Sequence, residues 1–185
     1  MKIYIASSWR CEYQPLAVQR LREIGHEVYD FRGKGTGWGD EVGCKDCEAA
    51  RNLAYPNPGR AGGYFAECPS HRGDGGFSWS EVDPDWKNWP SDIGRYLRGL
   101  NHPCALRGFN RDMDALKASD ACILVNPCGQ SAHAELGWAA GAGKQTAAWC
   151  PEIREPDLML KMASYITADW ESIERWLPIP VCAKE

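Results

Sequence analysis

The chain has 185 residues, a formal net charge of −4 and a 44% share of hydrophobic side chains. This length suffices for one domain with a buried core, and the apolar content excludes a disordered or collagen-like chain. The acidic balance argues against a general nucleic-acid binder, which neutralises phosphates with clustered Lys and Arg. No apolar run approaches the roughly 18 residues of a membrane span, and the first one is too short for a signal peptide. The sequence therefore predicts a cytoplasmic protein.

The first 32 residues predict a strand, a helix and a second strand. Lys2–Ala6 is strand-like, helical spacing runs over 15–24, and Gly25 stands where a helix C-terminal glycine belongs. The second strand is expected at 27–31. A strand–helix–strand unit this short predicts parallel pairing with a right-handed crossover.

The character of the sequence changes between residues 33 and 90. This stretch is rich in glycine, proline and tryptophan and shows little periodicity. A loop of that length without structure of its own is unusual in a compact domain, so we expect something to fold it locally. The sequence predicts a single domain over 1–185, with 33–90 as an insertion after the second strand.

Regular patterns return after residue 90. The predicted helices are 91–100, 103–119, 131–142 and 169–176, and the predicted strands are 120–126, 145–149 and 165–167. Strands that alternate with helices predict an α/β three-layer sandwich with a mainly parallel, five-stranded sheet. Ligands of such sheets bind beyond the carboxyl ends of the strands, which draws attention to the junctions 7–10 and 126–137.

Ser131 and Glu135 are four residues apart, so a helix that begins near Ser131 places both on one face close to its N-terminus. The exposed amides there attract anions, which suits a phosphate or a sugar hydroxyl. The alternative is a capped helix with an acid that favours the helix dipole. A capping box, however, places its acid three residues after the cap, where this chain has Ala134. Both roles stay open for Glu135.

Asp112 is a second candidate carboxylate. It falls on the apolar stripe of its predicted helix, which consists of Phe109, Met113 and Leu116. A carboxylate on a buried face needs a partner or a task, so a core hydrogen bond and a ligand contact are both open. Two carboxylates near one strand end fit sugar chemistry, in which acids serve as nucleophile or proton shuttle.

With these residues, several segments together resemble the nucleoside 2-deoxyribosyltransferase-like superfamily, especially its bacterial and phage-encoded branch. The segments are 1–10, 28–32, 76–80, Asp112, 119–120 and 128–144. The most specific part is the pattern of Ser131, Glu135 and Gly137 followed by Gly143-Lys144. The resemblance covers 1–32 and 76–149 well and the C-terminal part loosely.

This resemblance implies a flavodoxin-like fold and cleavage of an N-glycosidic bond in a small nucleoside or nucleotide. It implies that Glu135 attacks the anomeric carbon and that Asp112 binds or protonates the leaving base. It assigns substrate binding to Ser7, Ser8, Trp9, Arg10, Gly129 and Ser131. Ser131 would lie near a 5′-hydroxyl or 5′-phosphate. Family members often complete the site with a neighbouring subunit, so a homodimer or higher homo-oligomer is implied.

The reaction itself stays open between transfer to another base and hydrolysis. The first loop has Ser7, Ser8 and Trp9 where the transferases usually place an aromatic residue and a Gly-Pro pair. The segment 127–130 replaces their Asp-Gly-Thr approach to the glutamate helix. Two further functions remain as alternatives. One is a nucleotide-binding or sensor module without turnover, and the other is an NAD-type glycohydrolase.

A metal site is predicted within the insertion. Nine cysteines is an odd number without a secretory pattern, and a reducing cytosol favours a metal over disulfides. Two close ligand pairs, Cys44 with Cys47 and Cys68 with His71, suit a tetrahedral zinc ion whose four protein ligands make it structural. Zinc binding would also help to order the segment, whereas the alternative is cysteines that hold no metal. No organic cofactor is expected.

The insertion is also predicted to lie near the rim of the active site, as a lid or an oligomer contact. Its aromatic residues include Trp38, Tyr64, Phe65, Trp79, Trp86 and Trp89. Most of them are expected to form local core, and one could instead stack on a base.

Overall fold

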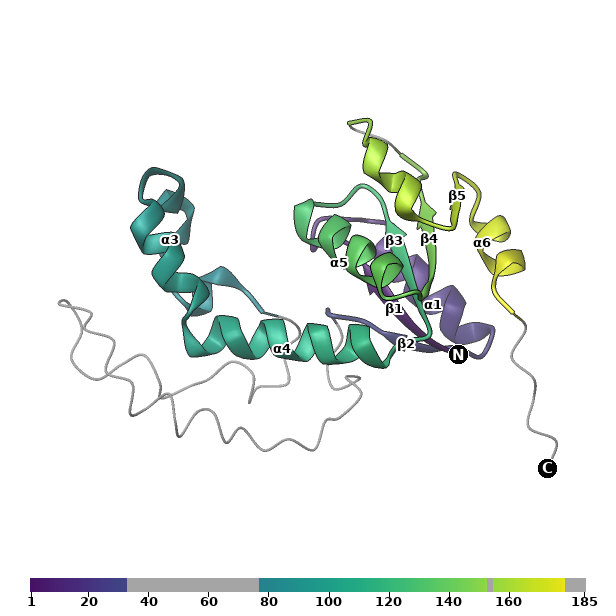
Figure 1. Ribbon diagram of the computed structural model, residues 1–185, viewed down its shortest axis with the longest axis horizontal. Helices are drawn as coiled ribbons and strands as arrows, with labels where there is room; N and C mark the ends of the chain where they lie inside the picture. The colour runs from purple at the N-terminus through teal and green to yellow at the C-terminus, as the bar shows by residue number, and fades with distance from the viewer. Residues whose placement is uncertain (33–76, 153–154, 179–185) are drawn as a thin grey trace, which may run out of the picture. The chain divides into compact units, whose positions relative to one another are not determined.

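The computed structural model describes residues 1–32, 77–152 and 155–178, and its elements are shown in Figure 1. The chain divides into two compact units. The first comprises Met1–Asp30 and Asp114–Glu185, and the second comprises Phe31–Met113. The cysteine–histidine group predicted to bind zinc lies outside the described residues, as do Trp38, Tyr64 and Phe65.

Five parallel strands form the sheet of the first unit in the order β2-β1-β3-β4-β5. They are β1 (Lys2–Ala6), β2 (Glu27–Tyr29), β3 (Ala121–Val125), β4 (Gln145–Trp149) and β5 (Tyr165–Thr167). The central strand β3 is completely buried, as expected for a parallel strand covered on both faces. The predicted parallel, five-stranded α/β sheet is confirmed.

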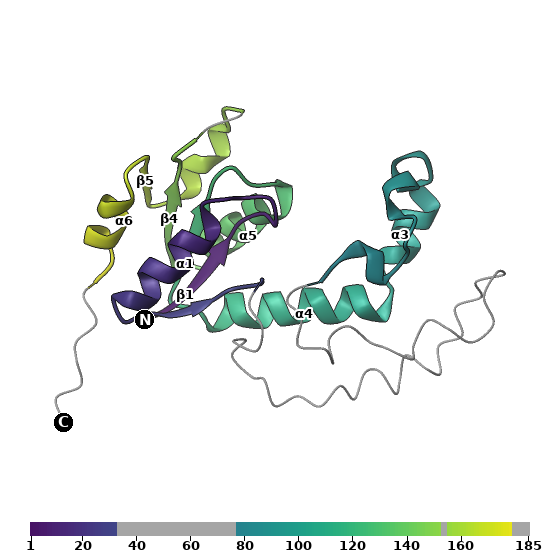
Figure 2. The same cartoon turned by 180° about the vertical axis from the view of Figure 1, so that it is seen from behind.

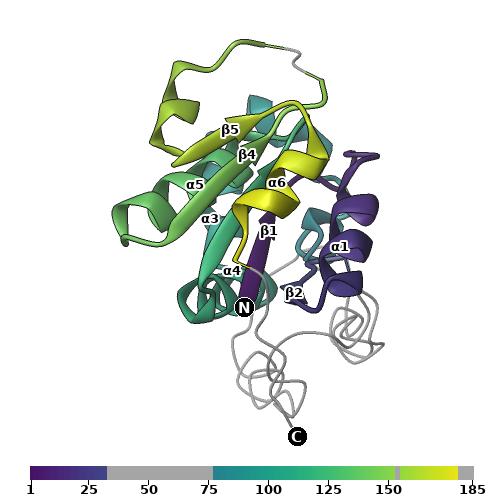
Figure 3. The same ribbon diagram turned by 90° about the vertical axis from the view of Figure 1, so that its right-hand side faces the viewer.

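Helices cover both faces of this sheet. They are α1 (Gln14–Glu23), α5 (Gln130–Gly141) and α6 (Trp170–Trp176), with the short helix η4 (Leu158–Met162) between β4 and β5. Figure 1 shows α5 in front of the strands, and Figure 2, seen from behind, shows α1 in front of β1. The view along the sheet in Figure 3 places α5 on one side and α1 and α6 on the other, which makes three layers.

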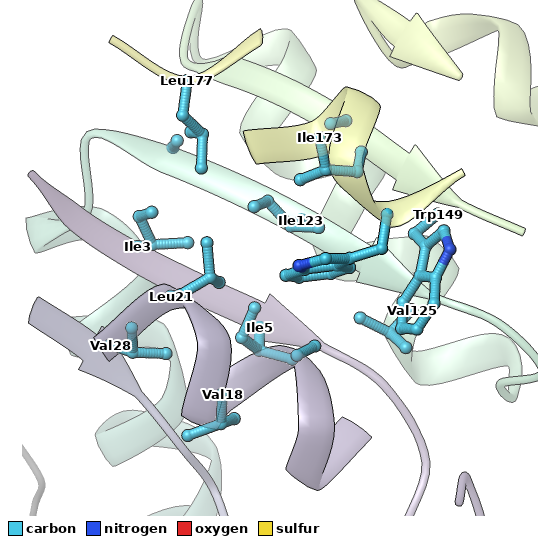
Figure 4. Packing of buried hydrophobic residues seen from close by; sticks show 14 of the residues in the cluster. Ile3, Ile5, Val18, Leu21, Val28, Ile123, Val125, Trp149, Ile173 and Leu177 are labelled. Atoms are coloured by element: carbon cyan, nitrogen blue, oxygen red, sulfur yellow. The ribbon is translucent and has the colours of Figure 1, made fainter. Parts of the chain in front are cut away.

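The main hydrophobic core lies between the sheet and the helices α1 and α6 (Figure 4). Because strand side chains alternate between faces, Ile3, Ile5 and Ile123 point into this core. The intervening residues Tyr4 and Cys122 are buried toward the opposite face. This alternation leaves the carboxyl ends of the strands free to carry polar loops.

Glycines end two of the helices as expected. Gly25 and Gly143 adopt φ angles of 89° and 74°, a left-handed conformation that suits glycine and stops a helix. Most predicted boundaries agree with the structure within two residues. The largest change concerns residue 91, because the helix α3 begins at Ile93 after the short helix η3 (Trp86–Ser91).

The described part of the second unit is helical. It contains η2 (Trp79–Glu81), η3, α3 (Ile93–Leu100) and α4 (Pro103–Ala118), whose last turn belongs to the first unit. Trp79 and Trp89 pack edge to face with ring centroids 5.2 Å apart. Gly99 faces Trp89 so closely that a Cβ atom there would lie 2.5 Å from the ring. These two tryptophans therefore form local core, and Trp86 is half-buried.

Candidate functional site

The loop after β1 is fixed to the end of β3. Ser7 Oγ donates to the Val125 carbonyl at 2.9 Å. Ser8 closes the turn that follows, because its Oγ accepts from the Arg10 amide at 3.2 Å and its carbonyl from the Cys11 amide at 3.0 Å. The two junctions expected to carry the site thus meet at one edge of the sheet.

Asn126 organises the end of β3 and precedes a cis peptide bond to Pro127. Its side-chain nitrogen donates to Cys150 Sγ at 3.2 Å, and its side-chain oxygen accepts from Cys128 Sγ at 3.4 Å. The Cys11 thiol contacts the Asn126 carbonyl oxygen at 3.6 Å. Three thiols therefore surround one asparagine.

The sequence patterns do not predict this group of Cys11, Cys128 and Cys150. A signal was available, because each of them follows a different strand of the parallel sheet. The carboxyl ends of parallel strands meet at one edge, so residues just beyond them come together whatever their separation in sequence.

Two of these thiols, Cys128 and Cys150, have a pKa raised by burial, which favours the protonated form. Burial raises the pKa of Cys128 to about 12, and the neighbouring Cys11 and Cys150 and the carboxylates of Glu135 and Asp157 add to this effect. A thiol is a poor nucleophile and a poor metal ligand unless it loses its proton. Consistent with this, no group of three or more candidate ligands capable of holding a metal ion occurs within residues 1–32, 77–152 and 155–178.

A cavity of about 660 Å³ opens beside this edge of the sheet. Its walls come from three stretches of the first unit: the loop after β1, the β3–α5 junction and the segment before and within η4. The lining residues are Ser8, Arg10, Asn126, Pro127, Cys128, Gly129, Gln130, His133, Glu155, Pro156, Asp157, Leu158 and Leu160. The predicted residues Ser8, Arg10 and Gly129 are thus brought together.

The N-terminus of α5 points its free amides toward this junction without a side-chain cap. Gly129 is the N-cap residue, and the first turn contains no acidic side chain. Ser131 is the second residue of the helix and is exposed, so it does not cap it. The alternative explanation of the serine–glutamate spacing as a capped helix is therefore wrong, and the amides stay available for an anion.

Glu135 is half-buried and lies one turn after Ser131. Its carboxylate is close enough to β3 to raise the pKa of the buried Cys122 thiol, in addition to the larger effect of burial. Neither Ser131 nor Glu135 lines the 660 Å³ cavity. His133 and Gly137 are offset from Ser131 and Glu135 by two residues, which is about 200° around the helix, so the two pairs face different flanks of α5.

Trp9 and Asp112 are the remaining residues predicted for the site. Trp9 is 52% exposed. Asp112 belongs to the second unit, is half-buried, and has an oxygen 3.7 Å from Arg111 Nε. The apolar stripe expected around it is not continuous, because Phe109 is 63% exposed whereas Leu116 is fully buried. Helical spacing marks a face but does not show which part of it is covered.

Lys144, which belongs to the most specific part of the sequence pattern, has a structural contact. Its Nζ donates to the Lys117 carbonyl at 2.8 Å and to the Ser119 carbonyl at 2.5 Å. These carbonyls lie at the C-terminal end of α4, where a cation is favourable.

With this geometry in place, comparison with known proteins identifies one informative likeness. Neither the family models nor the curated proteins gave a match. Among solved structures, a 2-deoxyribosyltransferase from the psychrotolerant bacterium Bacillus psychrosaccharolyticus matches with a TM-score of 0.50. The two chains are 19% identical over 97% of each. The fold is that of the nucleoside deoxyribosyltransferases. This confirms the flavodoxin-like fold predicted from the sequence.

The helices also bear on the expectation about membranes. Within the part of the chain that the structure describes, no helix combines the length and the apolar character needed to cross a bilayer.

The zinc site stays a prediction, because its expected ligands Cys44, Cys47, Cys68 and His71 lie outside the described residues.

Proposed function

We propose that the protein cleaves the N-glycosidic bond of a nucleoside or nucleotide, with Glu135 as the nucleophile. One observation carries this proposal: the Glu135 carboxylate is half-buried on the second turn of α5, behind an uncapped N-terminus at the carboxyl edge of the sheet. A second support is the fold shared with an enzyme named as a 2-deoxyribosyltransferase.

In the proposed reaction, an oxygen of Glu135 forms a bond to the anomeric carbon while the carbon–nitrogen bond to the base breaks. The electron pair of that bond leaves with the base, which takes up a proton. The resulting glycosyl ester is then attacked by a nitrogen of another base, which gives transfer, or by water, which gives hydrolysis. Asp112 is proposed as the proton donor on the sequence pattern alone.

Substrate binding is proposed for the polar residues at the same edge. Ser8, Arg10 and Gly129 line the cavity, and Ser131 lies in the first turn of α5, where backbone amides favour an anionic or hydroxyl group. Ser7 is proposed to hold the loop through its bond to Val125, and Trp9 is exposed enough to meet a ligand. A cytoplasmic homo-oligomer is proposed as the working form.

The direct test is a chromatographic screen of deoxynucleosides and deoxynucleotides, with and without an acceptor base. We expect release of the base, and Glu135→Ala should lower this rate by at least about a thousandfold while the far-ultraviolet circular dichroism stays unchanged. Glu27→Gln is the matched control, because Glu27 is an exposed carboxylate on β2. An unchanged rate in Glu135→Ala would overturn the proposal.

The same screen, with NAD added as a substrate and with a separate measurement of nucleotide binding, distinguishes the two alternative functions. Tight nucleotide binding with no base released over a long incubation would favour a sensor module. Release of nicotinamide from NAD, with no reaction of deoxynucleosides, would favour a glycohydrolase of that class.

The structural zinc site is proposed separately, on Cys44, Cys47, Cys68 and His71. Elemental analysis of the purified chain should give one zinc per chain, and replacing Cys44 and Cys47 by serine should abolish binding. A content far below one metal per chain in the unmodified protein would contradict this proposal.

A further inference from the structure

His133 contacts two parts of the cavity wall. Its Nδ1 lies 3.0 Å from the Gly129 carbonyl oxygen and 3.6 Å from Cys128 Sγ, both in the β3–α5 junction. Its Nε2 lies 3.3 Å from Asp157 Oδ2, in the segment that leads into η4. Each ring nitrogen therefore lies within contact distance of an oxygen atom. The ring bridges the two walls of the cavity.

The segment 157–162 is attached to α5 at a second point. The Asp157 oxygen that does not face His133 accepts from the Met159 amide at 2.8 Å and so begins η4. Met162 lies against Gly137, where a Cβ atom would come within 3.2 Å of its Cε. His133 and Gly137 are one turn apart on α5, so both attachments use the same flank of the helix.

Residues of the segment 155–160 form the outer wall of the cavity, so this wall is in place only while the segment stays attached to α5. Leu158 and Leu160 supply apolar lining, yet Leu158 is 77% exposed and η4 contains no buried residue. A five-residue helix with so little buried surface gains little stability from burial. Its position therefore depends on its polar contacts, of which the contact to His133 is the one that reaches across to the junction.

We propose that His133 is a positioning residue, which holds the segment 155–162 against α5 and so maintains the outer wall of the substrate cavity. The claim that this cavity admits the part of the substrate remote from Glu135 rests on the proposed function, because Glu135 itself does not line it. The claim that His133 holds the wall rests only on the contacts above. The pattern of Ser131, His133, Glu135 and Gly137 then serves two flanks of one helix, one toward the proposed chemistry and the other toward the wall.

The two ring nitrogens can be replaced one at a time. The side-chain nitrogen of glutamine takes a position like that of Nε2, and the side-chain nitrogen of asparagine takes a position like that of Nδ1. His133→Gln should therefore keep the contact with Asp157, and His133→Asn should lose it. Hydrogen exchange of the Met159 and Ala163 amides reports on the wall without any need for activity.

We expect exchange in 155–163 to be at least about tenfold faster in His133→Asn and Asp157→Asn than in the unmodified protein. It should be close to unmodified in His133→Gln. The two asparagine substitutions together should add nothing to either one, because they break the same contact. Asp114→Asn is the control, since it removes an exposed ion pair with Lys117 elsewhere in the unit. Equal exchange rates in all variants, or additive effects, would overturn the proposal.

Kinetics test the link to the reaction. His133→Asn should raise KM for the best nucleoside about tenfold and change kcat by less than about threefold, because the wall binds but does not react. A fall in kcat with KM unchanged would show that His133 does not act through this wall. If the unmodified protein releases no base at all, the proposed function fails, while the exchange experiment still decides the role of His133.

Discussion

The two units of the molecule are stabilised in different ways. The first buries aliphatic side chains of alternate strand residues between a sheet and helices, so its core is spread over many elements. The described part of the second is organised around a few aromatic rings and one carboxylate: Asp83 accepts from Trp89 Nε1 at 2.9 Å and lies 2.7 Å from Arg95 Nε. The first core is therefore sensitive to lost side-chain volume, and the cluster is sensitive to added volume against its central ring. The difference predicts where single substitutions act.

The largest effect is expected in the sheet. Ile123 is fully buried on the central strand, so Ile123→Ala should lower the free energy of unfolding by about 2–5 kcal/mol through lost burial and a cavity. Urea denaturation measures this change. Ile166→Ala is the control, since Ile166 on the edge strand is 46% exposed, and it should cost less than about 1 kcal/mol. Equal losses would contradict a core centred on β3.

The aromatic cluster is tested by overpacking. Gly99→Ala places a Cβ atom against Trp89 and should cost about 1–3 kcal/mol, seen as faster hydrogen exchange in α3 with little change in the sheet. Gly94→Ala in the same helix meets its nearest atoms at 3.4 Å and should be neutral or slightly stabilising. Faster exchange in the sheet than in α3 would show that the units do not differ in this way.

A smaller effect is expected at Lys144. Lys144→Met removes two hydrogen bonds to the end of α4 and should cost about 1 kcal/mol, measured by urea denaturation. Lys117→Met removes an exposed charge from the same helix end but leaves its carbonyl in place, so it should cost only a few tenths of a kcal/mol. Without such a difference, Lys144 would have no capping role.

The smallest and most gradual effect is expected from pH, because the described part of each unit contains a buried histidine, His26 in the first and His102 in the second. Burial lowers the pKa of His26, helped by the N-terminal amino group, and burial with the charge of Arg107 lowers that of His102. The unfolded chain therefore binds more protons in the window below the ordinary histidine pKa of about 6.5, and acidification through this window destabilises the fold.

Substitution separates the two histidines. His26→Gln should reduce the loss of protection in the sheet on going from about pH 7 to 5, and His102→Gln should do so in the second unit. Hydrogen exchange corrected for its intrinsic pH dependence measures both. An unchanged pH response in both variants would contradict the assignment.

Much of the candidate site could be placed from the sequence, and particular residues show why. Ser8, Arg10 and Gly129 were expected at one edge because parallel strands bring their following loops together, and they line one cavity. The thiols of Cys11, Cys128 and Cys150 obey the same rule but were overlooked. The contact of His133 with Asp157 had no local signal, because a contact between a helix and a distant segment depends on how the two pack.

Local sequence determined the strands, the helices and their glycine ends, since backbone preferences act over a few residues. The alternation of strands and helices along the chain predicted parallel pairing, whereas the order of the strands came from the structure. Tertiary structure alone decided which face of each helix is covered. Phe109 and Leu116 share a stripe, yet one is exposed and the other buried. Likewise, helical spacing places Ser131 and Glu135 on one flank of α5 and His133 and Gly137 on another, but only packing decided that His133 lines the cavity and Glu135 does not. The burial of a residue depends on which other elements pack against it, and the spacing of residues in the sequence does not specify those elements.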